Sequence, residues 1–210
     1  MTTYWDEKIL DVWNEIQLRQ QWEERNQQKP PLTWEACLAA AEQGRLEYEG
    51  RTLAFSERMF FDERVRMILP CSLHLVPKGL MSQSRAAQPH EQLVCQDKEG
   101  TILLGLNHMT HPLSMKESES FLQAMTAQIK KKTPGLQIVS NDWWEHEGLR
   151  VAICEYVVPM ENDPYYQIMF ATAVMGRAFF GSLVFPAREA SLWQPLANAL
   201  IRTLRVIESA

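Results

Sequence analysis

The sequence contains no long apolar run. No window approaches the roughly 18 to 20 apolar residues that would span a bilayer. The acidic residues Asp6 and Glu7 near its start are followed by no apolar stretch of the kind that secretory signals contain. These two features predict a cytoplasmic protein without a membrane span. With 46% hydrophobic residues among 210, the chain is still long enough to bury a substantial core.

Dense cysteine and excess positive charge are also missing. The four cysteines are spread singly, unlike those of a secreted disulfide scaffold, so we expect reduced and mostly buried thiols: Cys37, Cys71, Cys95 and Cys154. The net charge of −5 opposes the counterion release that drives binding to nucleic acid, and it disfavours anionic lipid as well. We therefore expect no nucleic acid and no membrane surface as a partner.

Common catalytic motifs are absent as well. Gly181-Ser182 lacks the G-x-S-x-G pattern of a nucleophile elbow and lies inside a predicted strand. Cys95 and Cys154 also lie in predicted strands, where the role of a small buried hydrophobic residue is favoured. Four acidic residues surround a predicted hairpin turn, where carboxylates are usually solvated: Asp142, Glu145, Glu147 and Glu155. We predict no catalytic residue and no cofactor.

Two residue pairs have the spacing of metal ligands. Cys71-x-x-His74 and His108-x-x-His111 would give zinc a tetrahedral shell if the fold brought them together. The first pair follows a predicted strand and the second lies in a predicted loop before a helix. Polar residues commonly form solvated turns at such positions, and this interpretation is favoured over a metal site.

The first segment of the chain has helical periodicity. Apolar residues at spacings of three and four predict an amphipathic helix that ends near Arg25: Trp5, Ile9, Val12, Trp13 and Ile16. Residues 26–31 form a linker, because Pro30 and Pro31 cannot continue a helix. The aromatic stripe is too large to leave in water. The helix therefore packs on its own sheet, forms a homodimer or docks on a foreign protein, and the first two are favoured.

Short helical and extended segments follow the linker. Thr33 is the predicted N-cap of a helix over residues 34–43. A short hairpin follows over residues 45–55, and residues 60–69 form one extended segment that Pro70 closes. Residues 77–90 are predicted to be an exposed contact loop and residues 92–107 a second hairpin, after which residues 108–112 lead to a helix.

The second half of the chain has the clearest pattern. Ser114 and Glu117 form a capping box for a helix that runs to Lys132. Four strands then form an antiparallel meander over residues 136–144, 149–157, 165–174 and 177–185. A last helix begins near Ser191, where Gln194 completes a second capping box.

The order of these elements from about Phe60 to Ile207 resembles the PsbP-like fold. That superfamily is named for an extrinsic photosystem II subunit, and it includes a Ran-binding nuclear import factor and bacterial adaptor chaperones of secreted effectors. The resemblance implies an α+β protein, an α/β/α sandwich with a central antiparallel sheet, here with an N-terminal helical extension. It also implies that the protein binds other proteins. We assign the extension and its short hairpin to residues 1–55 and the sheet domain to residues 56–210.

Two groups of side chains in the meander are candidates for a partner-binding surface. Trp143 and Trp144 are adjacent in a predicted strand and point to opposite faces, so either one of them is exposed or both are covered, and the second alternative is favoured. Met160, Met169 and Met175 border the same strands, and flexible thioethers suit an adaptable contact surface as well as a core. Trp5 and Trp13 of the first helix complete the predicted contact set.

These observations favour a non-enzymatic protein-binding module, an adaptor or chaperone whose partner the sequence does not identify. The alternative is a small-molecule or metal-binding protein, including a hydrolase, with a pocket near His74, His108 and His111. A third possibility is a structural homodimer built on the N-terminal helix.

Overall fold

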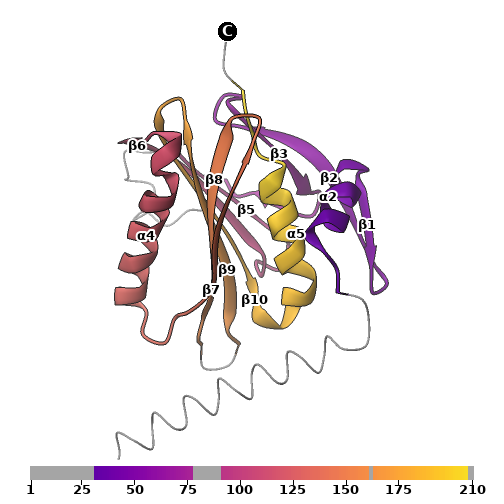
Figure 1. The fold of residues 1–210 in the computed structure, drawn as a ribbon. Coiled ribbons are helices and arrows are strands. Elements are labelled where there is room, and N and C mark those ends of the chain that lie inside the picture. Colours follow the sequence, from indigo (N-terminus) through magenta and orange to yellow (C-terminus); the bar gives the residue numbers. More distant parts are fainter. Residues whose placement is uncertain (1–30, 78–90, 161–162, 208–210) are drawn as a thin grey trace, which may run out of the picture. The chain divides into compact units, whose positions relative to one another are not determined.

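The computed structural model describes residues 31–77, 91–160 and 163–207 (Figure 1). Its contacts divide the chain into Met1–Leu32 and Thr33–Ala210, and the structure below is that of the second unit. The predicted N-terminal helix with Trp5 and Trp13, and the homodimer contact assigned to it, lie outside the described residues. The predicted contact loop also lies outside them, apart from Pro77.

An antiparallel sheet of seven strands forms the centre of this unit, in the order β4-β5-β6-β10-β9-β8-β7 (Figure 1). The strands are β4 (His74–Leu75), β5 (Glu91–Gln96), β6 (Leu103–Pro112), β7 (Gln137–His146), β8 (Leu149–Val158), β9 (Tyr165–Val174) and β10 (Arg177–Pro186). The predicted meander is confirmed as β7 to β10. Two-residue turns with positive φ at Glu147-Gly148 and Met175-Gly176 join its outer pairs, as tight hairpins require.

The predicted hairpin over residues 92–107 is also confirmed, as β5 and β6. Its turn is closed by Asp97, whose carboxylate accepts the backbone N–H groups of Thr101 at 2.7 Å and Ile102 at 2.9 Å. The predicted loop over residues 108–112 is wrong, because β6 continues to Pro112 and pairs there with β10. Pairing with a strand about 70 residues away, which local sequence does not reveal, extends β6 beyond its apolar alternation.

A second sheet has four strands in the order β1-β2-β3-β11. They are β1 (Arg45–Tyr48), β2 (Arg51–Phe60), β3 (Val65–Pro70) and β11 (Arg205–Val206). The first two confirm the predicted short hairpin. The predicted domain boundary between residues 55 and 56 falls inside β2.

The prediction of one extended segment over residues 60–69 is wrong. β2 ends at Phe60, and the chain reverses through Phe61, Asp62 and Glu63, all with positive φ, before β3 begins. Phe61 is apolar and does not mark a turn in the sequence. It is buried because its ring packs edge-on against Phe179 of β10, with centroids 5.7 Å apart.

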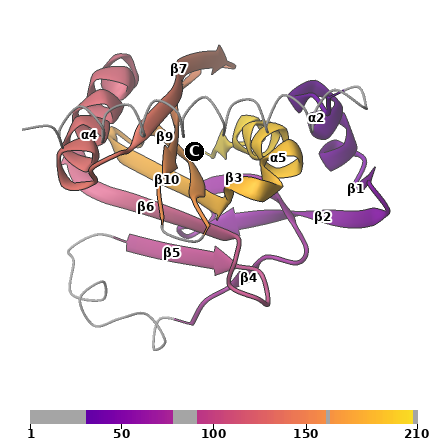
Figure 2. The ribbon, with the colours of Figure 1, turned by 90° about the horizontal axis from the view of Figure 1, so that it is seen from below.

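Helices cover both faces of the seven-stranded sheet (Figure 2). α4 (Ser118–Lys132) packs on β8 and β9 from one face, and α5 (Ala190–Arg202) packs on β9 and β10 from the other, with α2 (Trp34–Glu42) against α5. The unit is therefore the predicted α+β sandwich with a central antiparallel sheet. Within the described ranges, no helix has the length and apolar character needed to cross a membrane.

The two main helices begin in different ways. The predicted capping box before α4 is confirmed: the carboxylate of Glu117 accepts the backbone N–H of Ser114 at 3.0 Å and its hydroxyl at 2.6 Å. A short 3-10 turn, η2 (Met115–Glu117), precedes α4. The second predicted capping box is wrong, because α5 already begins at Ala190 after η3 (Ala187–Glu189), and Gln194 lies inside the helix.

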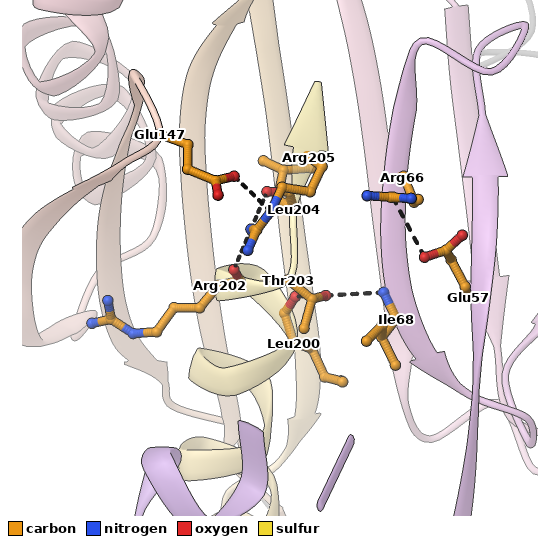
Figure 3. A network of polar contacts seen from close by, with 9 residues as sticks. All are labelled: Glu57, Arg66, Ile68, Glu147, Leu200, Arg202, Thr203, Leu204 and Arg205. Atoms are coloured by element: carbon orange, nitrogen blue, oxygen red, sulfur yellow. Dashed lines mark hydrogen bonds and ion pairs between the residues drawn. The ribbon is translucent and has the colours of Figure 1, made fainter. Parts of the chain in front are cut away.

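The end of α5 connects the two sheets (Figure 3). The Thr203 hydroxyl accepts the backbone N–H of Ile68 in β3 at 2.9 Å and donates to the carbonyl of Leu200 at 2.6 Å. Arg205 of β11 lies 3.5 Å from the carboxylate of Glu147, in the turn between β7 and β8. These contacts hold the four-stranded sheet on the α5 side of the molecule.

Candidate functional site

β7 is the most exposed long strand of the seven-stranded sheet. It lies at one edge, pairs only with β8 among the described strands, and eight of its ten residues are exposed. Three of them are large and apolar: Ile138, Val139 and Trp143, which are 40%, 54% and 44% exposed. A bulge between Ile138 and Ser140 places Val139 outside the regular pairing with β8. Within the described part of the chain, the strand therefore offers an unpaired backbone edge together with apolar side chains.

The two adjacent tryptophans lie on opposite faces of β7, as alternation requires. Trp143 is opposite Ala152, which belongs to the core under α4, whereas Trp144 is opposite Val151. Trp143 is exposed and Trp144 is half-buried. Of the two alternatives for this pair, the favoured one, in which both rings are covered, is therefore wrong for Trp143.

Arginines fix both indole rings. Arg150 of β8 lies over the ring of Trp143, with its guanidinium carbon 4.0 Å from the centroid, and forms an ion pair with Glu119 of α4. Arg202 of α5 lies 4.2 Å from the centroid of Trp34 and 5.5 Å from that of Trp144. A cation over a ring face is attracted by its quadrupole, so these contacts reduce the freedom of both rings.

Burial lowers the pKa of Arg202, an effect that the carboxylates of Asp142 and Glu35 oppose. The Nε1 atom of Trp144 and the Nε atom of Arg202 are buried without a hydrogen-bond partner. The contact with Arg202 holds Trp144 against α5, and Trp143 is the more accessible ring of the pair.

Charge is divided between the two ends of β7. Three exposed lysines end the helix that precedes the strand: Lys130, Lys131 and Lys132. Exposed carboxylates occupy the second half of the strand and its turn: Asp142, Glu145 and Glu147. β7 itself contains no lysine, arginine or proline. Basic residues therefore precede β7 along the chain, and acidic residues occupy its second half and the turn that follows.

The three candidate methionines do not form one surface. Met160 follows β8 and Met175 lies in the turn at the far end of β9, and both are more than half exposed. Met169 is fully buried, and its sulfur accepts the hydroxyl of Tyr156 at 3.0 Å. Met160 lies at the same end of the sheet as Ile138, because β8 ends where β7 begins.

The candidate metal ligands are not brought together. His74 in β4 is opposite Gln96, which is opposite Leu103, and His108 is five residues further along β6, or about 17 Å. His108 is buried against Phe61 in the reversal between β2 and β3, whereas the ring of His111 stacks on Phe121 of α4. Both histidines lie on β6, and residues three positions apart on a strand point to opposite faces of the sheet. Cys71 is exposed after β3. No cluster of three or more metal-binding side chains occurs within the part of the chain described.

One buried carboxylate was missed by sequence reasoning. Glu155 was grouped with the solvated acids of a turn, but it lies inside β8 and is only 5% exposed. It accepts hydrogen bonds from the hydroxyl of Tyr166 and from the side-chain amides of Gln194 at 3.0 Å and Asn198 at 2.9 Å. The available signal was its place in an otherwise apolar strand. Because the donors lie on β9 and α5, the carboxylate connects the helix to the sheet.

Comparison of the sequence with family models and with curated proteins finds no match. Comparison of the structure with solved structures does find likeness. The solution structure of the cyanobacterial PsbP protein (CyanoP) from Synechocystis sp. PCC 6803 superposes with a TM-score of 0.55, covering 73% of this chain and 92% of that one at 10% identity. The chain has the PsbP-like fold. At this identity the likeness concerns the fold alone.

Two further solved structures cover much of this chain, at lower TM-scores. LpqN, involved in cell envelope biogenesis of Mycobacterium tuberculosis, has a TM-score of 0.43, 11% identity and coverage of 86% of this chain and 100% of its own. The immunity protein TplEi of the T6SS from Pseudomonas aeruginosa has a TM-score of 0.41, 8% identity and coverage of 79% and 76%.

Proposed function

We propose that this protein is a non-enzymatic, cytoplasmic adaptor or chaperone that binds an extended segment of a protein partner as an additional strand along β7. The observation that carries the proposal is the exposed edge of β7, ten residues long, with Ile138, Val139 and Trp143 beside it. Strand addition gains affinity from main-chain hydrogen bonds and specificity from alternate side chains.

The geometry of β7 suits this kind of binding. The exposed ring of Trp143 is held over Arg150, so it loses little freedom when a partner covers it. A partner segment with basic residues opposite Asp142 and Glu145 would complement the second half of the edge. The free thiols of all four cysteines are compatible with a reducing compartment.

Binding along β7 is tested by comparing edge variants of the full chain. Val139→Pro blocks the free edge at a position where the bulge already interrupts pairing with β8, so the fold should be retained. Proteins recovered from native lysate by the wild type, identified by mass spectrometry and then purified, should bind Val139→Pro at least tenfold more weakly. Trp143→Ala should cost about 2 kcal/mol of binding free energy, the range of an interface hot spot.

The matched control is Leu75→Ser. Leu75 is apolar and about as exposed as Val139, and it lies at the opposite edge of the same sheet. Leu75→Ser should leave partner binding unchanged. If Val139→Pro binds the purified partner as tightly as the wild type does, the partner uses another surface and the proposal fails.

A further inference from the structure

Hairpin geometry decides which backbone groups of β7 point to its outer edge. Both residues of the turn Glu147-Gly148 have positive φ, which is the geometry of a type I′ turn. In such a tight hairpin the flanking residues, His146 and Leu149, form a hydrogen-bonded pair, and hydrogen-bonded and non-hydrogen-bonded pairs then alternate along the strands. Three residues in the regular part of β7 therefore direct their N–H and C=O groups away from β8: Asn141, Trp143 and Glu145.

One of these outward N–H groups is engaged within β7 itself. The carboxylate of Asp142 accepts the backbone N–H of Trp143 at 2.8 Å, which agrees with an N–H that points away from β8. Charged side chains commonly protect the edges of sheets, and this carboxylate protects the middle of the regular edge. A strand that pairs with Trp143 must draw the carboxylate away, so that its own carbonyl can accept the N–H. Asp142 is therefore placed as a gate on strand addition.

Acidic charge is in excess on the face of β7 that α5 covers. Asp142 lies on this face, because it alternates with Ser140, which is opposite the α5 contact Glu155. Asp142 and Glu35 both act on the guanidinium of Arg202, so these three groups leave one negative charge in excess. A basic side chain brought beside Asp142 would balance that charge.

The other face of β7 has the same balance. Glu145 is directly opposite Arg150 of β8, but Arg150 already forms an ion pair with Glu119 of α4. These three groups again leave one negative charge in excess. The net charge of −5 on the whole chain favours the approach of a basic segment as well.

We propose that the partner segment has the pattern basic, apolar, apolar, basic, with its basic residues opposite Asp142 and Glu145. The pattern complements residues 142–145, which are acidic, apolar, apolar and acidic, because residues directly opposite in neighbouring strands share a face. It reads the same in both strand directions. The basic residue beside Asp142 also draws that carboxylate from the N–H of Trp143, so the gate admits basic segments and holds back neutral ones. The inference rests on the proposed function, since it specifies the partner of the same edge.

Short synthetic peptides test the pattern. Labelled peptides with the central residues Lys-Val-Val-Lys or Gln-Val-Val-Gln, in identical Thr and Ser flanks, are titrated with the full chain and followed by fluorescence anisotropy. The basic peptide should bind roughly 2- to 30-fold more tightly than the neutral one, the range of two cross-strand charge pairs. A Lys-Lys-Val-Val isomer of equal charge should bind more weakly than Lys-Val-Val-Lys, because only one lysine then meets a carboxylate.

Two variants of one residue separate the gate from simple charge attraction. Asp142→Ala removes both the charge and the acceptor, so it should strengthen binding of the neutral peptide roughly 2- to 10-fold. Asp142→Asn removes the charge but keeps an acceptor oxygen, so it should leave the neutral peptide within about twofold of the wild type. Glu99→Gln, which removes an exposed carboxylate in the turn between β5 and β6, is the control and should leave the affinities of both peptides unchanged.

Three results would overturn the inference. They are no binding of Lys-Val-Val-Lys at millimolar concentration, equal affinities of the wild type for the basic peptide and for its neutral or isomeric counterpart, and the same effect of Asp142→Ala and Asp142→Asn on the neutral peptide. The proposed function fails separately, because Val139→Pro is measured with the partner purified from lysate. A partner lost by Val139→Pro, together with peptides of equal affinity, would leave the function standing and remove this inference alone.

Discussion

Two glycines on neighbouring strands show how strongly single residues differ in their surroundings. Gly181 of β10 is opposite Phe170 of β9, and a Cβ added at Gly181 would lie 2.1 Å from the nearest atom of that buried ring. A Cβ added at Gly105 of β6 would meet only the hydroxyl of Ser182 at 3.4 Å. The first glycine makes room for an aromatic ring in the core, and the second has ordinary space.

Gly181→Ala should therefore lower the free energy of unfolding by about 1 to 3 kcal/mol, the usual cost of overpacking a core. Gly105→Ala should be neutral or stabilising, because glycine inside a strand carries an entropic cost that alanine reduces. Urea denaturation of the two variants beside the wild type measures the difference. Equal stabilities for the two variants would show that the Phe170 ring moves aside freely.

At the scale of elements, α5 depends on a polar contact in an apolar setting. Three neutral donors from β9 and α5 converge on the carboxylate of Glu155, and burial of that carboxylate without them would be costly. Burial, together with the charge and hydrogen bond of Glu155, also raises the pKa of Tyr166, so its hydroxyl remains a donor. The network thus selects one position of α5 on the sheet.

Glu155→Ala should lower the free energy of unfolding by roughly 2 to 4 kcal/mol, because it leaves buried donors unsatisfied and opens a cavity. Glu155→Gln keeps one acceptor oxygen and should cost less. The exposed turn residue Glu99 provides the control, and Glu99→Ala should stay within about 0.5 kcal/mol of the wild type. Thermal and urea unfolding measure all three variants, and a Glu155→Ala protein as stable as the control would contradict a structural role for the network.

At the scale of the whole molecule, several buried thiol and phenol groups keep their protons to a higher pH in the folded protein than in the unfolded chain. Burial raises the pKa of the Cys37 thiol from 9.0 to about 11, and it also raises those of Cys95 and Cys154. Desolvation raises the pKa of the Tyr156 hydroxyl as well. The unfolded chain releases these protons at lower pH than the folded chain does, so the folded state binds more protons in this range.

Stability should therefore be fully present below about pH 8.5 and fall as the pH rises from about 9 to 11. Cys37 contributes about 1.4 kcal/mol per pH unit between its two pKa values. Cys37→Ala should flatten the fall, and Cys71→Ala, which removes an exposed thiol, should not. Urea midpoints measured from pH 7 to 10.5 give the slope, and a stability that stayed constant or rose over this range would refute the argument.

Local sequence patterns determined the order and type of most elements. Alternation and turn residues located β7 to β10, and the Ser114 and Glu117 box located the start of the helix before them. Alternation also placed Trp143 and Trp144 on opposite faces. Each of these features depends on residues close together in the chain, so their physical cause is present in the sequence.

Tertiary structure decided which residues are buried and which edge is open. The reversal at Phe61, the extension of β6 to Pro112 and the burial of Glu155 all depend on partners far away in the chain. The position of β7 at the edge follows from the order of strands in the sheet. Strand order and helix packing depend on how the whole chain buries its apolar surface, so a local sequence pattern does not predict them.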